Sequence, residues 1–553
     1  MDTDSLSDSS EYGADAEPSG SPFSWSPTPP PFFPCHINRL PFELLSWIFR
    51  LARGSYRPIL DNASHLQMAA WDISYVCSQW RRVAIGTPVL WDTFYLTASN
   101  SSVTPGRVNC QLARSGSIPI DVVMNWFPDA HATGQLASRS LEETLSPLIR
   151  HASRWRSMDM SFQDQSSMHD ALTLLRQYTA PLLRTVRIMS YRHGARAEES
   201  RKIPADGYAP FTCGGTIPLQ LRELCLSGVT LNQRCLSSQE LLYLDLGRRE
   251  TLFSADETTI LGLLATTPSL TTFTLDYFPP FDLEITAPGN QRIDLPNLKE
   301  LTLRSSQPRD LKRLWNQLNV PNVRMLRLDL EHDEFDRFLR VLKKPYEGIN
   351  RSILNSLEGL WLVNLDCSRG RRRQMLTYLD NVRVLVVRDQ GDLLYEISDG
   401  GILDDITKMT KKHQRAEATG GKFPSLPCLS TLVVVESDAA DAVAKIKNLI
   451  TARKKAGMPL RKLFVDDTSM PDPVDISWFT SNLEVFGAIR EDGLDDGVTI
   501  EFADLMALDR LSPRSPAFRE ICQDYKCRAY VEGPGGAAVR VDGRRSRSRS
   551  SIW

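Results

Sequence analysis

The 553-residue chain lacks several features that would assign it at once to a broad class of protein. It has no run of about eighteen apolar residues, which a transmembrane helix needs, and no apolar secretory signal at its start. Its 10 cysteines form no Cys-x-x-Cys pair, and its 8 histidines are widely spaced, so no metal-ligand pattern is present. We therefore expect an intracellular protein, cytoplasmic or nuclear, with reduced thiols and without a cofactor or metal.

Motifs of the common enzyme classes are also missing. The chain contains no GxxxxGK[ST] loop, no HExxH helix, no GxSxG elbow and no glycine-rich dinucleotide fingerprint. Its formal net charge is −2, which argues against a dedicated nucleic-acid binder. These absences predict a protein that is not an enzyme and binds neither nucleic acid nor a membrane. An active site assembled from distant residues remains the alternative.

Both ends of the chain have the composition of disordered segments. Residues 1–34 are acidic and then Ser/Pro-rich, so they cannot bury enough apolar surface to offset the entropy of ordering. Residues 531–553 end in a short Arg-Ser run, which we interpret as a solvated tail. A nuclear address or a phosphorylation site is the alternative for that run.

A compact helix is predicted just after the first segment. Pro41 suits a first helical position, since its fixed φ fits a helix and its missing N–H would be unpaired there anyway. Leu44, Leu45 and Ile48 follow at helical spacing, and Gly54 is a suitable C-terminal stop. The residues around Leu40 and Pro41 could form an exposed apolar face for a partner or could pack on the next domain.

Two further helices are predicted before residue 98. The stretch 71–85 has one apolar stripe that includes Val76 and Trp80, and residues 54–70 before it are expected to form an inserted loop. A Thr-Pro pair then starts a short third helix that carries Trp91. Three short helices make a very small core, which would gain stability from a partner that covers its remaining apolar face.

From about residue 150 a short phrase recurs, with the pattern apolar-x-x-apolar-x-apolar. Its clearest copies are LRELCL (221–226), LLYLDL (241–246), LTTFTL (270–275), LKELTL (298–303), VRMLRL (323–328), LEGLWL (357–362), VRVLVV (382–387), LSTLVV (429–434) and LRKLFV (460–465). The end of the phrase alternates between apolar and other residues, which is typical of a strand with one buried face. Stretches such as 258–269 and 441–457 have the pattern of amphipathic helices.

A strand and a helix in about every twenty to forty residues predict an irregular leucine-rich-repeat solenoid over residues 99–530. This is an α/β fold with a curved parallel sheet and helices on its outer face. The asparagine that follows the phrase in regular repeats is mostly absent. An ordinary doubly wound α/β domain is the alternative, but it gives no reason for the sameness of the phrase.

Alternation along these strands predicts which side chains face which way. The paired leucines of each phrase should point inward as continuous buried rows. The residues between them should lie on the concave face as candidates for target binding: Cys225, Asp245, Thr274, Thr302, Arg327 and Trp361. Trp361 is the best single candidate for a partner anchor, since tryptophan is enriched at binding hot spots. The alternative is that Trp361 packs under a loop.

The helical segment resembles the F-box, whose pattern is Leu-Pro, an acid, a leucine pair and Ile-Phe, then Val-Cys-x-x-Trp and a final Pro-x-Leu-Trp. The matching residues are Leu40, Pro41, Glu43, Leu44, Leu45, Ile48, Phe49, Val76, Cys77, Trp80, Arg81, Pro88, Leu90 and Trp91. An F-box domain at 35–98 followed by irregular repeats is similar to the large F-box families of mushroom-forming (basidiomycete) fungi.

That resemblance implies the substrate receptor of an SCF-type (Skp–cullin–F-box) ubiquitin ligase. The residues implied to bind the Skp adaptor, which links to the cullin scaffold, are Leu40, Pro41, Leu44, Leu45 and Ile48. We interpret Val76, Trp80 and Trp91 mainly as core of the F-box. The repeats would hold the target protein. The alternative is a leucine-rich-repeat scaffold for protein interactions without a role in ubiquitin ligation.

Overall fold

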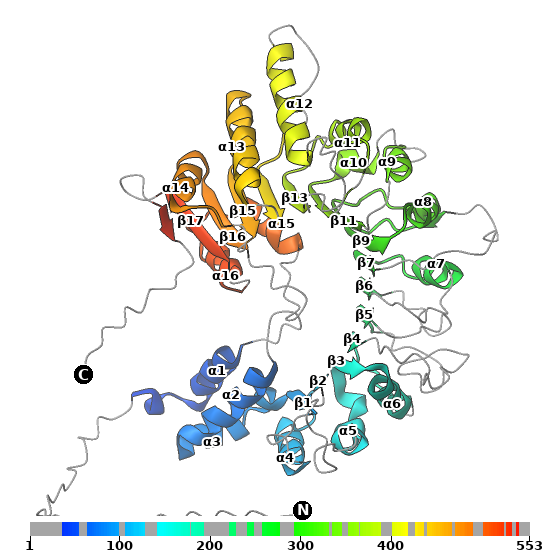
Figure 1. Cartoon of the computed structure of the whole chain (residues 1–553). Helices are drawn as coiled ribbons and strands as arrows, with labels where there is room; N and C mark the ends of the chain where they lie inside the picture. The colour runs from blue at the N-terminus through cyan, green and yellow to red at the C-terminus, as the bar shows by residue number, and fades with distance from the viewer. Residues whose placement is uncertain are drawn as a thin grey trace, which may run out of the picture.

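A computed structural model of the chain shows a mixed α/β fold built on one large, curved sheet (Figure 1). The 16-stranded sheet runs parallel from β1 to β16, whereas β17 and β18 are added antiparallel at its end. The structure describes residues 36–54, 63–98, 105–127, 141–176, 178–192, 220–227, 240–247, 257–276, 292–330, 335–345, 352–363, 365, 367–388, 401–417, 426–435, 439–466, 470–489, 502–524, 527–532 and 538–540. The predictions for 1–34 and for the Arg-Ser run fall outside these residues, whereas the tail expected to be disordered from residue 531 includes strand residues of β17 and β18.

The strands of the large sheet follow one another in chain order. They are β1 (Thr93–Thr97), β2 (Ile120–Trp126), β3 (Trp155–Asp164), β4 (Thr185–Arg192), β5 (Glu223–Ser227), β6 (Tyr243–Leu246), β7 (Thr272–Asp276), β9 (Glu300–Ser306), β11 (Met325–Leu330), β12 (Gly359–Val363), β13 (Val384–Arg388), β14 (Thr431–Val435), β15 (Lys462–Asp466), β16 (Val485–Ile489), β17 (Arg528–Glu532) and β18 (Ala538–Arg540). Two short strands, β8 (Ile293–Asp294) and β10 (Leu318–Asn319), pair separately. A parallel neighbour requires a crossover connection. Described helices lie in most of these connections, although none is described between β4 and β5, β5 and β6, or β7 and β9.

Most helices lie on the outer side of the sheet (Figure 1). They are α4 (Pro105–Ser115), α5 (Leu141–Ile149), α6 (Gln165–Leu175), α7 (Glu257–Ala265), α8 (Pro308–Gln317), α9 (Asp336–Leu342), α10 (Ile353–Ser356), α11 (Arg369–Leu376), α12 (Ile402–Glu417), α13 (Ala439–Lys455) and α14 (Pro473–Asn482). The inner side carries α15 (Phe502–Arg510) and α16 (Pro516–Asp524). The N-terminal unit contains α1 (Phe42–Arg53), α2 (Ala63–Val76) and α3 (Ser78–Ile85), with short 3₁₀ turns at His36–Arg39 and Pro88–Trp91. A third 3₁₀ turn, Ala152–Arg154, lies just before β3.

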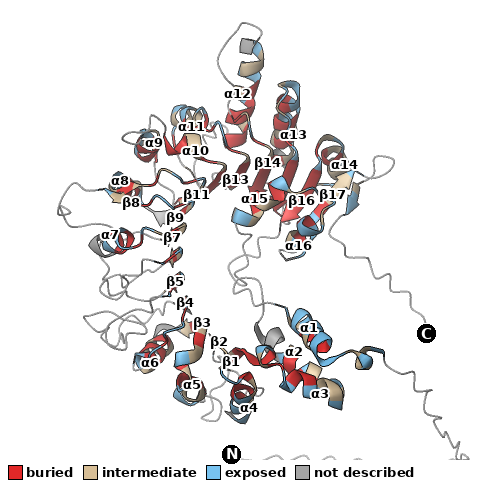
Figure 2. Cartoon of the chain, turned by 180° about the vertical axis from the view of Figure 1, so that it is seen from behind, coloured by how far each residue is buried: buried red, intermediate tan, exposed pale blue. Residues whose placement is uncertain are grey.

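The recurrent phrase forms the strands, as predicted. Leu326 of β11 lies beside Leu301 of β9 and Leu360 of β12, and the register continues in both directions along the sheet. The twelve paired residues of the phrase in β5, β6, β7, β9, β11 and β12 are all at most 3% exposed. Each buried leucine contributes about 1.5–3 kcal/mol. The buried layer between the strands and the outer helices is visible in Figure 2.

Asparagine side chains join neighbouring turns ahead of the strands. The Nδ2 atoms of Asn297, Asn322 and Asn381 each donate a hydrogen bond to a backbone carbonyl of the preceding repeat, at 3.1, 2.7 and 2.6 Å. These bonds pair carbonyls outside the strand ladder and so tie one repeat to the next. The asparagines therefore precede the phrase rather than follow it.

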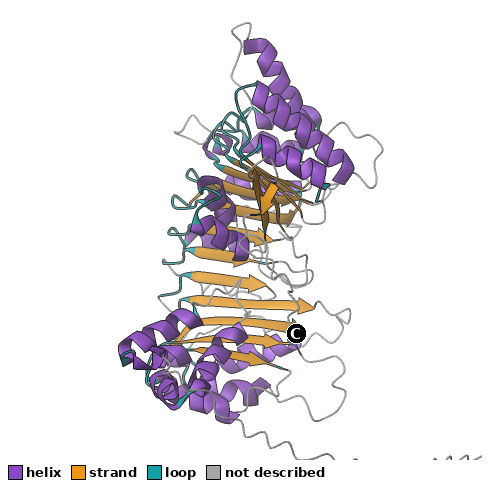
Figure 3. Ribbon diagram, turned by 90° about the vertical axis from the view of Figure 1, so that its left-hand side faces the viewer, coloured by secondary structure: helices purple, strands orange, loops and turns teal. Residues whose placement is uncertain are grey.

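Helices α15 and α16 cover the inner face of the last parallel strands. Leu505, Leu508 and Phe518 pack there against Val433 and Phe464. Because most inner positions of β12 to β16 are apolar, they need such a cover. The concave face is therefore divided: its C-terminal part is filled by the chain itself, and the described residues leave the strands from β4 to β9 visible from the open side (Figure 3).

A buried lysine holds the end of α15 in place. Lys462 donates hydrogen bonds to the carbonyl oxygens of Asp509 at 2.9 Å and Leu511 at 2.6 Å. Carbonyls at a helix C-terminus attract a cation, which offsets the cost of burying the ammonium group. Burial nevertheless lowers the pKa of Lys462. The Asp509 carboxylate accepts a further hydrogen bond from Thr431 Oγ1 at 2.8 Å.

The N-terminal helices differ from the prediction in two respects. Gly54 does end α1, with a φ of 76° that favours glycine. The expected helix at 71–85 is instead broken at Cys77, which has extended backbone and caps α3 through Sγ. The expected loop at 54–70 is helical from Ala63 onward. Within the described residues, no helix is long and apolar enough to cross a membrane.

Candidate functional site

The N-terminal unit has a small aromatic core. Trp91 is fully buried and meets Trp71 edge-on at a centroid distance of 5.1 Å. Its indole Nε1 donates a hydrogen bond to the carbonyl oxygen of Ala84 at 2.8 Å. Leu45 and Phe49 of α1 are buried in the same cluster. The prediction that Trp91 belongs to the core is therefore confirmed.

The other side of α1 is apolar and exposed. Leu44, Trp47, Ile48 and Leu51 recur at i, i+3, i+4 and i+7, and Trp47 and Leu51 are 62% and 66% exposed. We call these four residues the α1 outer stripe. Exposed apolar side chains that are grouped in this way are typical of an interaction surface, whereas single exposed apolar residues are common on any protein.

The structure corrects part of the predicted adaptor site. Leu45 is fully buried, so it cannot contact a partner, whereas Leu44, Ile48 and Pro41 are exposed and Leu40 is half-buried. Helical spacing alone placed Leu44 and Leu45 on one stripe, although Leu44 faces solvent and Leu45 faces the core. Trp47 and Leu51 were missed, even though their spacing from Leu44 was visible in the sequence.

The predicted core residues Val76 and Trp80 also lie differently. Val76 is 60% exposed, so its assignment to the core is wrong. The break at Cys77 is the reason, because it interrupts the single apolar stripe that the sequence suggested. Trp80 is half-buried, with its ring centroid 4.9 Å from that of Phe49 and its Nε1 donating to Asn38 Oδ1 at 2.8 Å.

Ion pairs join the N-terminal unit to the sheet. Arg53 at the end of α1 donates to Asp92 Oδ1 at 2.6 Å, and Arg156 of β3 lies 3.3 Å from the other oxygen of Asp92. Arg156 also donates to Asp121 Oδ1 at 3.0 Å, and this hydrogen bonding raises the arginine's pKa against the effect of burial. A shared, buried carboxylate fixes the unit against the first strands better than an exposed pair would.

The six predicted target-binding residues do form one row across the concave face. Backbone pairing connects Cys225, Asp245, Thr274, Thr302, Arg327 and Trp361 in neighbouring strands. Four of them are buried, namely Cys225, Thr274, Thr302 and Trp361, while Asp245 and Arg327 are half-buried. The buried four cannot supply exposed contacts for a target.

Trp361 in particular is not a free anchor. It is 2% exposed and belongs to the cluster under α15 and α16. The guanidinium carbon of Arg327 lies 3.8 Å from its ring centroid, which is cation–π geometry. The indole of Trp361 therefore packs inside the fold and is not exposed to a partner.

Asp245 carries the most perturbed carboxyl on this face. Burial raises its pKa to about 6, and the neighbouring Asp276 adds to the rise against the opposing effect of Arg304 and Arg187 and a hydrogen bond from Tyr243. A carboxyl whose pKa is raised by folding destabilises the folded state once it is ionised. The chain should therefore lose stability as the pH rises from about 4 to about 6.

Replacing Asp245 with asparagine should stabilise the chain by about 2 kcal/mol at pH 7 and leave it unchanged near pH 4. The measurement is thermal unfolding of both proteins at the two pH values. Asp329→Asn, further along the same face, is the control and should give no such gain. An equal effect of Asp245→Asn at both pH values would contradict the assignment.

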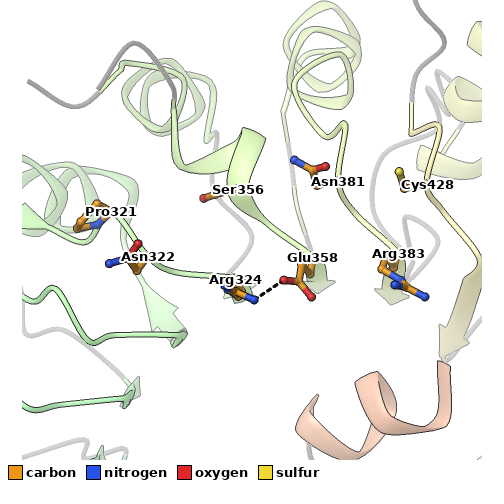
Figure 4. A pocket seen from close by; sticks show the side chains of 8 residues that line it. All are labelled: Pro321, Asn322, Arg324, Ser356, Glu358, Asn381, Arg383 and Cys428. Atoms are coloured by element: carbon orange, nitrogen blue, oxygen red, sulfur yellow. Dashed lines mark hydrogen bonds and ion pairs between the residues drawn. The ribbon is translucent and has the colours of Figure 1, made fainter. Parts of the chain in front are cut away.

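A hollow of about 530 Å³ opens at the N-terminal edge of β11 to β14 (Figure 4). Its lining comprises Pro321, Asn322, Arg324, Ser356, Glu358, Asn381, Arg383 and Cys428. The charged groups are paired, since Arg324 and Arg510 each bind Glu358 at 2.9 Å and Arg383 lies 3.1 Å from Asp509. The hollow holds no acid–base pair free for catalysis among its lining residues.

Comparison with models of known protein families gives no match, and no curated protein matches the chain. In the part of the chain that the structure describes, no group of three or more His, Cys, Asp or Glu is placed to hold a metal ion. The candidate sites are thus two surfaces: the α1 outer stripe and the open part of the curved sheet with its edge.

Proposed function

We propose that the chain is an F-box protein with irregular leucine-rich repeats that acts as the target receptor of an SCF-type ubiquitin ligase. The helical unit, within 35–98, would dock on the Skp adaptor and through it on a cullin scaffold. The curved sheet, within 99–530, would hold the target. The observation that carries the proposal is the α1 outer stripe on a unit fixed to a large curved sheet.

The proposed mechanism is proximity rather than chemistry by this chain. A receptor of this kind holds a target lysine near a ubiquitin-charged enzyme that other subunits bring, which raises the effective concentration of the two reactants. The rigid link through Asp92 supports this role, because a fixed angle between adaptor and target keeps that distance constant.

Replacing Trp47 and Leu51 together with alanine should weaken Skp adaptor binding by about thirtyfold or more, since a hot-spot residue contributes about 2 kcal/mol. Both side chains are mainly exposed, so the thermal unfolding temperature should barely change. Titration calorimetry of the full chain with purified Skp adaptor is the measurement.

Val474→Ala is the matched control, because Val474 is 79% exposed on α14 at the other end of the sheet. It should bind the adaptor as the unmodified chain does. If the unmodified chain does not bind the adaptor, the ligase role fails, and a scaffold that binds other proteins without ubiquitin ligation becomes the better interpretation.

A further inference from the structure

A row of residues runs along the edge of the sheet where the strands begin. Each repeat places one residue just before its strand, and each backbone N–H in this row donates to the carbonyl of the previous member at 2.8 Å. Between β4 and β11 the members are Arg184, Arg222, Leu242, Thr271, Lys299 and Arg324. We call these six residues the edge row. Strand spacing sets their separation at about 4.8 Å per step.

The edge row is positively charged at both ends. Arg184, Arg222, Lys299 and Arg324 are exposed. No ion pair joins the first three to another described residue, while Arg324 shares Glu358 with Arg510. This charge is therefore available to a ligand.

The nearby acidic side chain of Glu223 does not neutralise this charge. Glu223 faces the concave side, where it lies 3.6 Å from Arg187 and accepts a hydrogen bond from Thr185 at 3.4 Å. The centre of the edge row is uncharged, and Leu242 is 38% exposed there. The edge row thus combines two cationic ends with an uncharged centre that exposes Leu242.

Its dimensions match a short extended peptide. Five steps from Arg184 to Arg324 span about 24 Å, and three steps from Arg222 to Lys299 span about 14 Å. An extended chain advances about 3.3 Å per residue, so seven or eight residues would cover the edge row. We propose that the edge row binds an extended acidic segment of a target protein, with acidic residues at both ends and an apolar residue opposite Leu242.

This inference rests on the proposed function, because it names the chemistry of the target that the receptor would hold. A nucleic acid fits the edge row less well. Its phosphates are evenly spaced, whereas the two central positions of the row, Leu242 and Thr271, carry no charge. The edge row also contains no aromatic side chain on which a base could stack.

The position of the edge row suits a receptor. The equivalent position in β3 is Arg156, which binds Asp92 at the junction with the helical unit. The other end of the row reaches the hollow beside Arg324. A peptide on this edge would therefore extend along the sheet from the side of the helical unit.

A second set of exposed cations allows a matched control. Lys408, Lys411, Lys412 and Arg415 recur at i, i+3, i+4 and i+7 on the outer helix α12. Unlike the edge row, this set has no exposed leucine between two separated groups of positive charge. Reversing two of them changes the net charge as much as reversing two members of the edge row does.

The test uses the full chain and fluorescence anisotropy at physiological salt. The probe is a labelled eight-residue peptide with two glutamates at each end and a leucine near the middle. Arg222→Glu combined with Lys299→Glu should weaken its binding about tenfold or more, since two ion pairs become repulsive contacts. Lys408→Glu combined with Lys412→Glu should change it less than about twofold, because salt screens distant charges.

The order of the charges provides a second readout. A peptide of the same composition with all four glutamates adjacent should bind more weakly than the probe, and Leu242→Ser should reduce that difference. Equal losses in the two double variants would overturn the proposal in favour of unspecific attraction. Tighter binding of a single-stranded RNA, lost in the edge variant, would assign the edge to nucleic acid instead.

The same variants also distinguish a failure of the edge-row proposal from a failure of the ligase proposal. Skp adaptor affinity should be unchanged in Arg222→Glu with Lys299→Glu, because these residues lie on the sheet and not on the α1 outer stripe. A chain that binds the adaptor but not the peptide would refute only the edge site. A chain that binds the peptide but not the adaptor would refute only the ligase role.

Discussion

Trp91→Ala is expected to unfold the N-terminal helical unit, because truncating a buried tryptophan costs about 3–5 kcal/mol. Trp91 is fully buried, packs edge-on against Trp71 and donates a hydrogen bond to Ala84. A unit with so small a core has little stability to spare. Limited proteolysis and urea unfolding should show early cleavage and loss of the unit's transition, while the sheet remains folded.

Two other tryptophans provide graded controls for this result. Trp47 is 62% exposed, so Trp47→Ala should change the free energy of unfolding by less than about 0.5 kcal/mol. Trp80 is half-buried against Phe49, so the effect of Trp80→Ala on the free energy of unfolding should fall between those of Trp47→Ala and Trp91→Ala. Full resistance of Trp91→Ala to protease and urea would show that the aromatic cluster does not stabilise the unit.

Asp405→Asn should cost about 3 kcal/mol, because removing one partner of a buried ion pair leaves the other charges uncompensated. Asp405 is completely buried at the start of α12 and binds three side chains of α11. Arg369, Arg372 and Arg373 lie 3.1, 2.7 and 2.8 Å from its oxygens. The substitution should separate α11 from α12, which hydrogen exchange of both helices can measure.

The acid dependence of this contact has a definite sign. Burial alone would raise the pKa of Asp405, but hydrogen bonds from Arg372, Arg369 and Arg373 hold it below its ordinary value. The contribution of Asp405 is therefore present above its unfolded-state pKa of about 3.9 and is lost as the pH falls through the folded-state pKa. Asp404→Asn, one residue earlier and half-buried, is the control and should cost much less than Asp405→Asn.

Some features of the molecule could be predicted from local sequence because their physical cause is local. Leu224, Leu244 and Leu301 are buried where the phrase placed them, since side chains alternate along any strand. The same copies of the phrase lie in register in one parallel sheet, because a repeated unit can bury its apolar face only against its neighbours. Gly54 ends α1 for an equally local reason, its positive φ.

Predictions about exposure were less reliable, since exposure depends on what packs against each residue. In α1, Leu44 and Leu45 have the same hydropathy and adjoining positions, yet one faces solvent and the other the core. Val76 became exposed because the backbone at Cys77 is extended, and no residue type in the stretch signalled that break. The edge row was likewise overlooked, although each cation occupies the same position of the phrase.

The sequence by itself determined the parallel strands, their inward rows and the helical character of the N-terminal unit, because apolar periodicity acts over a few residues. Only the tertiary structure decided how the concave face is used. Helix α15 returns to strands that precede it by more than a hundred residues, as in the Arg383–Asp509 contact across 126 positions. It buries the face around Trp361, so the side chain that the sequence suggested as a partner anchor is enclosed by the chain itself. Contacts between segments so far apart leave no periodic signal in either of them.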